Sequence, residues 1–265
     1  MVFFADMRQV VKRPTGRLFL LLFLLATPVT APAAELMVLT AGAFKPVLLA
    51  AEGDFRAAAL HSLRVENDTV GATSKKIEGG AAFDVAVLTP AAIDELAGKG
   101  FIVQGTRTAL ARIGVGVMVK AGATKPDISS VDAFKRALLG AKTVAYIDPA
   151  SGGSSGIYVA RLLERLGIAD AIKPKAKLKQ GGYVADLVVS GEAEIGIHQI
   201  SEILPVSGVA LVGPLPAEIQ NYTVYAGGLG AKSATPEAAT ALIKFLAGPQ
   251  LAPVLKSKGM DAPGS

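Results

Sequence analysis

The chain has 265 residues, with 27 Lys and Arg against 22 Asp and Glu and a formal net charge of +5 at pH 7. Its basic residues are scattered and it has no Trp, so it lacks the charged patch and stacking surfaces of nucleic-acid-binding proteins, and we expect no nucleic-acid partner. With no Cys and 2 His it also lacks the usual ligands of transition metals, so we predict neither a metal site nor a cofactor.

Residues 1–34 differ in composition from the rest of the chain. Four basic residues precede an apolar run at 18–26, and an Ala-Pro-Ala sequence follows at 31–33. This pattern predicts a secretory signal peptide, cleaved near Ala33. The alternative is an uncleaved membrane anchor, but the apolar run is shorter than the ~18 residues that a spanning helix needs.

Strands and helices alternate over residues 35–112. Short apolar runs predict strands, and segments with helical periodicity or capping signals predict helices. The predicted strands are 36–40, 62–67 and 83–88, and the predicted helices are 46–59, 74–78 and 89–97. Such alternation predicts an α/β fold with a mixed, mostly parallel sheet flanked by helices.

The remainder of the chain continues the same alternation. The predicted strands are 113–119, 143–147, 194–198, 209–212 and 222–229, and the predicted helices are 131–139, 156–166, 183–190, 236–247 and 249–258. There is no internal repeat and no long linker. Any two lobes must therefore be joined by strands.

The segment 148–156 contains three glycines and three serines between a predicted strand and a predicted helix. The first N–H groups of a helix have no partner within it, and its dipole places partial positive charge there. Glycines allow a ligand to approach the backbone, so the segment suits an anion site. The alternative is a serine-capped helix with an ordinary loop before it.

Residues 152–156 also spell G-x-S-x-G, and Asp186 and His198 follow in the order of a Ser-Asp-His hydrolase. A nucleophile elbow places its serine directly after a strand, whereas residues 148–153 separate the predicted strand from Ser154. His198 can instead line a pocket or be a buried strand-end residue bonded to the backbone. Hydrolysis is therefore the weakest of the functional alternatives.

Motifs spread over nearly the whole chain after residue 34 resemble those of the periplasmic molybdate-binding proteins, which are type II ABC transporter solute-binding proteins. These motifs are Val38–Phe44, Lys76–Val85, Gly156–Tyr158, Glu192–Ile197 and Phe245–Gln250. The resemblance implies two lobes around a cleft, which we place at 35–112 plus 222–265 and at 113–221. The chain is then expected to cross between the lobes near 109–114 and 219–225.

The resemblance also implies a set of residues around a bound oxyanion. Mapped onto this sequence and extended to neighbouring residues, it predicts as ligand-binding Ala43, Phe44, Lys45, Thr69, Val70, Ser154, Ser155, Gly156, Gly181, Gly182 and Gln199. The family's serines fall on Ala43 and near Val70, and its tyrosine falls on Gln199. A small organic carboxylate therefore suits the pocket as well as a molybdate-like oxyanion. Lys45 can equally be a solvated residue in the first turn of its helix.

The resemblance implies a periplasmic, monomeric solute-binding protein of an ABC importer, not an enzyme. Its expected partners are a small anionic solute and an ABC permease in the inner membrane. The alternatives are a sensory or accessory binding protein of the same fold and, less favoured, a serine hydrolase that uses Ser154.

Overall fold

The computed structural model describes residues 1–2 and 33–264. The predicted signal peptide lies almost wholly outside the described residues. Among the described residues, no single helix is long and apolar enough to cross a membrane. Only the last two helical segments, Pro236–Ala247 and Pro249–Ser257, pass that test as a pair, and they are bent by 59°.

The first part of the fold is built from three parallel strands, three α-helices and one short 3-10 helix. In chain order these are β1 (Glu35–Ala41), the short 3-10 helix η1 (Gly42–Phe44), α1 (Lys45–Ala59), β2 (Ser62–Asp68), α2 (Val70–Glu78), β3 (Val85–Leu88) and α3 (Pro90–Gly98). Strand β1 pairs with both β2 and β3 in parallel. All four residues of β3 are buried, as expected of a strand covered by helices on both faces.

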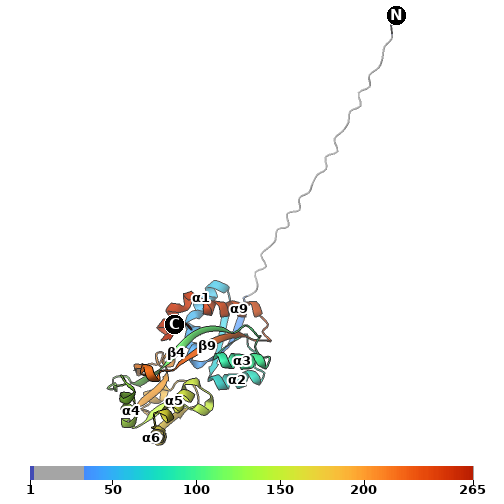
Figure 1. The fold of residues 1–265 in the computed structure, drawn as a ribbon. Helices are drawn as coiled ribbons and strands as arrows, with labels where there is room; N and C mark the ends of the chain where they lie inside the picture. The colour runs from blue at the N-terminus through green and yellow to red at the C-terminus, as the bar shows by residue number, and fades with distance from the viewer. Residues whose placement is uncertain (3–32, 265) are drawn as a thin grey trace. The chain divides into compact units, whose positions relative to one another are not determined.

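Two long strands run through the middle of the fold, β4 (Thr108–Lys120) and β9 (Tyr222–Leu229). Residues 108–114 of β4 pair with β9, which in turn pairs with β3, and both pairings are antiparallel. Residues 115–120 of β4 pair instead with two other strands, also antiparallel. Strand β4 thus continues from the first part of the fold into the second, and Figure 1 shows α1 and α9 on one side of β4 and β9, with α2 and α3 on the other.

The second part contains the remaining strands and helices. They are α4 (Val131–Gly140), β5 (Val144–Ile147), η2 (Pro149–Ser151), α5 (Ser154–Arg165), α6 (Ala169–Ile172), η3 (Lys173–Lys175), β6 (Ala176–Lys179), α7 (Ala185–Val189), β7 (Ile195–Gln199), α8 (Ile200–Ile203), β8 (Val209–Pro214) and η4 (Ala217–Ile219). After β9 the chain closes with α9 (Pro236–Ala247), η5 (Pro249–Leu251), α10 (Ala252–Ser257) and β10 (Met260–Asp261). The sheet order is β2-β1-β3-β9-β4-β7-β5-β6.

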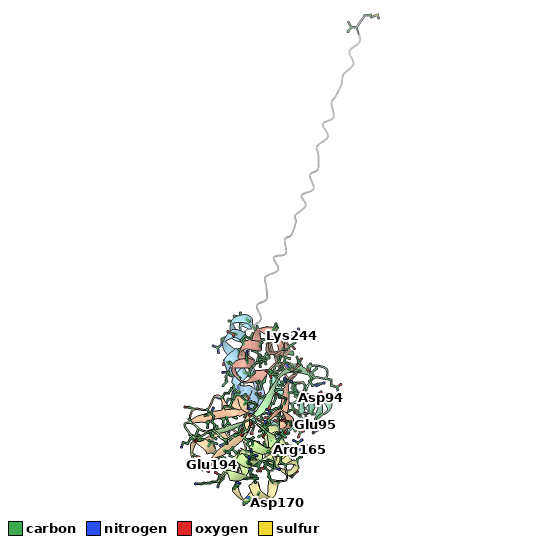
Figure 2. The ribbon with its side chains drawn as sticks, turned by 60° about the vertical axis from the view of Figure 1, so that its left-hand side comes forward. Asp94, Glu95, Arg165, Asp170, Glu194 and Lys244 are labelled. Carbon is green, nitrogen blue, oxygen red and sulfur yellow. The ribbon has the colours of Figure 1, made fainter. Side chains whose placement is uncertain are left out.

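The buried apolar side chains form separate clusters that follow these two parts. One cluster draws on residues 36–113 and 225–260, and the others draw on residues 115–219. Charged side chains such as Asp170, Glu194 and Lys244 are exposed and lie at the outside of the ribbon (Figure 2). The lobe boundaries at 35–112 plus 222–265 and at 113–221 stay a prediction.

Most predicted elements are present, with differences at their ends. Helix α5 begins at Ser154, two residues before the predicted start, because Gly153 is its extended N-cap residue. Helix α2 begins at Val70, because the Thr69 hydroxyl caps it by accepting from the Ala72 N–H at 3.1 Å. The short elements α6, β6 and α8 were not predicted, since four residues are too few to show a periodicity.

Candidate functional site

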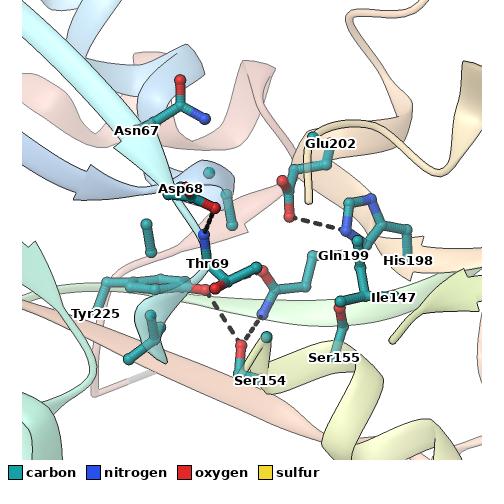
Figure 3. Close-up of a pocket in the computed structure, with 16 residues that line it drawn as sticks. Asn67, Asp68, Thr69, Ile147, Ser154, Ser155, His198, Gln199, Glu202 and Tyr225 are labelled. Atoms are coloured by element: carbon teal, nitrogen blue, oxygen red, sulfur yellow. Dashed lines mark hydrogen bonds and ion pairs between the residues drawn. The ribbon is translucent and has the colours of Figure 1, made fainter. Parts of the chain in front are cut away.

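A pocket lies where the first and second parts of the fold face each other (Figure 3). Its lining residues come from the ends of β1, β2, β5 and β7, from the starts of α2 and α5, from η1, α8 and β9, and from the loop before α7. They are Ala41, Gly42, Ala43, Asn67, Asp68, Thr69, Val70, Ile147, Gly153, Ser154, Ser155, Gly182, His198, Gln199, Glu202 and Tyr225. No Lys or Arg is among them, so an anion in this pocket has to be held by uncharged donors.

The N-terminus of α5 forms one wall of this pocket. Its N-cap residue, Gly153, supplies no side-chain cap, and Ser154 and Ser155 are the first two helical residues. Their N–H groups therefore have no partner within the helix and lie at the positive end of its dipole. Among the described residues, the Ser155 hydroxyl group has no hydrogen-bond partner although the residue is only 4% exposed. The two N–H groups and the Ser155 hydroxyl group are thus available to a ligand, and neither serine caps the helix, contrary to the alternative from sequence.

A close approach to β5 fixes the position of this helix. A Cβ atom on Gly156 would lie 2.2 Å from the carbonyl oxygen of Ile147. Only glycine fits there without a shift of the backbone. Gly156 therefore positions the α5 wall and does not line the pocket itself.

On the opposite side of the cleft, the start of α2 contacts the loop before α5 through Thr69. The Thr69 hydroxyl donates a hydrogen bond of 2.6 Å to the carbonyl oxygen of Ser151, and the Gly71 N–H donates one of 3.2 Å to the carbonyl of Gly152. The start of α2 and the loop before α5 are therefore in direct contact. The cleft is closed along this edge.

Tyr225, Gln199 and Ser154 form a hydrogen-bonded chain across the floor of the pocket. The Tyr225 hydroxyl donates to Gln199 Oε1 at 2.9 Å, Gln199 Nε2 donates to Ser154 Oγ at 3.2 Å, and the two hydroxyl oxygens lie 3.4 Å apart. Burial raises the pKa of the Tyr225 phenol, so it remains protonated at neutral pH. The phenol that the resemblance leads one to expect at Gln199 is thus supplied next to Gln199 by Tyr225 of β9.

His198 and Glu202 form a buried pair at the edge of the pocket. Nε2 of His198 lies 3.2 Å from Oε2 of Glu202, and their side chains are 2% and 9% exposed. Burial raises the Glu202 pKa to about 8 and lowers the His198 pKa to about 3. At pH 7 both groups are therefore predominantly uncharged, with the Glu202 carboxyl donating to the imidazole.

The other oxygen of the same carboxyl group lies over Gly42. A Cβ atom at Gly42 would lie 2.5 Å from Glu202 Oε1, so the missing side chain makes room for this oxygen. Nδ1 of His198 has no hydrogen-bond partner among the described residues. Gly42, His198 and Glu202 together hold a proton-bearing group inside a pocket that otherwise contains fixed donors.

The pocket brings together seven of the predicted site residues: Ala43, Thr69, Val70, Ser154, Ser155, Gly182 and Gln199. Four others lie outside its lining, Gly156 among them. Phe44 is fully buried behind Tyr225, with ring centroids 6.3 Å apart, and Lys45 is the first residue of α1. Gly181 lines an adjoining hollow. The ligand contacts themselves stay a prediction.

The hydrolase alternative is wrong, because its three residues do not form a relay. The Ser154 hydroxyl contacts Gln199 and Tyr225, and the His198 imidazole contacts Glu202. Asp186 is paired with Lys179 at 2.9 Å. Within residues 33–264, no imidazole or carboxylate is therefore hydrogen-bonded to Ser154 as a base. His198 is buried at the strand end, as one interpretation of the sequence predicts, but its partner is a carboxyl group and not the backbone.

Sequence reasoning missed three residues that define the pocket's chemistry: Glu202, Tyr225 and Asp68. Glu202 follows His198 by four residues, a spacing that brings side chains together on a helix, but His198 lies in strand β7. Tyr225 lies in β9, 71 residues from Ser154. Only the fold brings these positions together. Among the described residues, no group of three His, Cys, Asp or Glu could hold a metal ion.

Residues 36–261 match the family described as bacterial extracellular solute-binding protein. The chain belongs to this family. It is also 35% identical over 194 residues to a protein named aconitate isomerase from a Pseudomonas species, an alignment that covers 73% of this chain and 72% of that protein.

Solved structures of similar proteins show the same fold. The periplasmic molybdate-binding protein of Azotobacter vinelandii has a TM-score of 0.71 and 22% identity, over 86% of this chain and 99% of the other. The sulfate-binding protein SubI of Mycobacterium tuberculosis H37Rv has a TM-score of 0.71 and 18% identity, over 86% of each chain. The predicted two-lobed periplasmic-binding-protein fold is therefore confirmed, and these identities say nothing about the solute of this family member.

Proposed function

We propose that this protein captures a small organic anion with two or three carboxylates, as the solute-binding component of an ABC importer. The observation that carries the proposal is the lining of the pocket. It combines the unpaired N–H groups and the Ser155 hydroxyl group at the start of α5 with the Glu202 carboxyl group, which is mostly protonated at neutral pH and donates its proton to His198. The donors at the start of α5 bind an anion without a basic side chain, and the uncharged Glu202 carboxyl group does not repel it.

The shape of the site favours an extended carboxylate over a tetrahedral oxyanion. Ala43 provides no hydroxyl group, so one side of the pocket lacks a donor that a tetrahedral anion could use. A second hollow shares Asn67, Asp68 and Gly182 with the pocket and is also lined by Lys75. An anion that extends into this hollow gains a cation at its far end.

The same proposal includes export of the protein to the periplasm and a permease as its partner. The basic and apolar segment before Ala33 supports export to the periplasm with cleavage near that residue. Membership of the solute-binding family supports a permease partner that receives the solute. We propose that the protein acts as a monomer, because one pocket between two lobes suffices for capture.

The test is a titration of the purified protein with two sets of anions. The carboxylates are cis-aconitate, trans-aconitate, citrate and tricarballylate, and the oxyanions are molybdate, tungstate, sulfate and phosphate. We expect isothermal titration calorimetry to detect one site for at least one carboxylate. Gln199→Leu should weaken binding about tenfold, because it breaks the hydrogen-bonded chain on the pocket floor. The matched control is Gln250→Leu, since Gln250 is exposed and bonds only to the carbonyl of Phe245. Binding of oxyanions alone, or of no anion, contradicts the proposal.

A second candidate function is isomerisation of the captured carboxylate. The protonated Glu202 favours it, because a carboxyl group with a pKa near the working pH can both release and accept a proton. The relative named aconitate isomerase gives the reaction to test. We expect proton NMR to show trans-aconitate and cis-aconitate interconverting in the presence of the protein. An unchanged spectrum over many protein equivalents contradicts this second function while leaving capture intact.

A further inference from the structure

We infer that Glu202 is the catalytic residue of this pocket, taking a proton from one carbon of a bound unsaturated carboxylate and returning it to another. The inference rests on the isomerisation proposed above and names the group that performs it. No other side chain in the lining combines a free oxygen facing the pocket with a proton that it can exchange near neutral pH.

The first support is the geometry of the carboxyl group. Its Oε2 is held 3.2 Å from His198 Nε2, while Oε1 lies over Gly42 in space that a Cβ atom would fill. One oxygen is therefore anchored and the other faces the pocket. Figure 3 shows the carboxyl group and the Ser154 hydroxyl group on different sides of the pocket, with the Gln199 side chain between them.

The second support is the state of the other titratable groups around Glu202. His198 of β7 is neutral because burial lowers its pKa to about 3. Burial raises the pKa of the phenols of Tyr225 in β9 and of Tyr183 just before α7, so both stay protonated. Asp68 at the end of β2 accepts a hydrogen bond of 2.7 Å from the Thr69 N–H. Among the groups here whose pKa is shifted by burial, Glu202 is the one whose charge changes near neutral pH.

The proposed step conserves atoms and electrons. The ionised Glu202 carboxylate takes a proton from the methylene carbon next to the double bond, and the electron pair of that C–H bond forms a new C=C bond. The old double bond supplies the pair for a new C–H bond at the far carbon, where Glu202 returns the proton. Negative charge that develops on the substrate carboxylates is stabilised by the N–H groups of Ser154 and Ser155. The enzyme ends as it began.

The experiment measures exchange of ligand C–H protons with deuterium in D2O by NMR, together with calorimetric affinity for trans-aconitate. For the wild type, exchange should rise with pH and level off at or above about pH 8, because ionised Glu202 is the reactive form. Glu202→Gln keeps the shape of the side chain. We expect it to bind trans-aconitate within about threefold of the wild type and to exchange at least a hundredfold more slowly.

Two further variants separate catalysis from a structural role. Gly42→Ala pushes against Oε1, so exchange should fall by a larger factor than the affinity does. Glu164→Gln removes an exposed carboxyl group on α5 and should behave as the wild type.

Three results would overturn or separate the proposals. Wild-type exchange that persists in Glu202→Gln, or that does not depend on pH between 6 and 9, shows that Glu202 does not move the proton. Binding without any exchange in the wild type ends the inference and leaves capture standing. No binding of any carboxylate ends the proposed function itself.

Discussion

The two sides of the pocket differ in what they offer a ligand. The wall at the start of α5 offers fixed N–H and hydroxyl groups, held in place by the approach of Gly156 to β5. The opposite corner offers His198 and Glu202, whose pKa values are moved far from normal by burial. The first side attracts negative charge and exchanges no proton, whereas the second side can exchange one. Because different elements supply the two properties, each can be changed alone.

The largest expected effect comes from disturbing the α5 wall through Gly156. Gly156→Ala places a Cβ atom 2.2 Å from the backbone oxygen of Ile147, so α5 has to shift. We expect the free energy of unfolding to fall by about 3 kcal/mol, at the upper end of the usual cost of overpacking. Urea denaturation measures it.

The control for this substitution is Gly53→Ala in α1, where a new Cβ atom meets nothing within 4 Å. It should raise the stability by roughly 0.5–1 kcal/mol, because alanine is the better helix former. Equal stability of the two variants would show that Gly156 does not hold α5 against β5.

The next prediction concerns the buried pair of His198 and Glu202, and how the stability of the protein depends on pH. The folded-state pKa of Glu202, about 8, exceeds its ordinary value of 4.5. The unfolded chain therefore releases this proton first, and stability is lost as the pH rises from about 4.5 to 8. The folded-state pKa of His198, about 3, lies below its ordinary value of 6.5, so stability is lost as the pH falls from about 6.5 to 3. The two contributions offset each other between about 4.5 and 6.5.

Thermal or urea unfolding from pH 3 to pH 9 tests this profile. Between pH 6.5 and 8 the Glu202 contribution should lower the wild-type stability by about 2 kcal/mol. Glu202→Gln should remove that loss, and Glu164→Gln should keep it. A wild type and a Glu202→Gln variant with parallel profiles would contradict the assignment of a protonated buried carboxyl group.

The smallest expected effect is at Thr69, where the two parts of the fold meet. Thr69→Ala removes the cap of α2 and the hydrogen bond to Ser151, and should cost about 1 kcal/mol of stability. Ser130→Ala is the control, because Ser130 caps α4 in the same way by accepting from the Ala133 N–H at 3.2 Å. We expect only Thr69→Ala to weaken carboxylate binding, by several-fold in calorimetry. Equal carboxylate affinities in the two variants would show that the contact of Thr69 with Ser151 does not contribute to ligand binding.

The sequence predicts the α5 wall because that wall is local. A strand, a serine- and glycine-rich loop and a helix follow one another within 144–165, so the physics of helix ends identifies the donors from the order of residues alone. The order of strands and helices is predictable for the same reason. The antiparallel pairing of β4 with β7, β8 and β9 is less so, because it depends on how distant segments meet.

The buried pair of His198 and Glu202 could not be predicted in this way. The pKa of Glu202 depends on burial among β7, α8 and η1, and its space depends on the missing Cβ atom of Gly42. The sequence indicates His198 as a candidate pocket residue, but it does not indicate the carboxyl partner of His198. Tyr225 looks like an ordinary aromatic residue of a strand until the fold places its hydroxyl group 2.9 Å from Gln199. Most of these contacts join residues far apart in the chain, and no local sequence pattern predicts them.

The most direct test of the central claim is a crystal structure of the protein grown with saturating trans-aconitate. The account predicts that trans-aconitate lies between the two sides of the pocket. One of its carboxylates accepts hydrogen bonds from the N–H groups of Ser154 and Ser155, and the methylene carbon of the ligand faces Glu202. A carboxylate bound elsewhere, with the pocket occupied only by solvent, would contradict it.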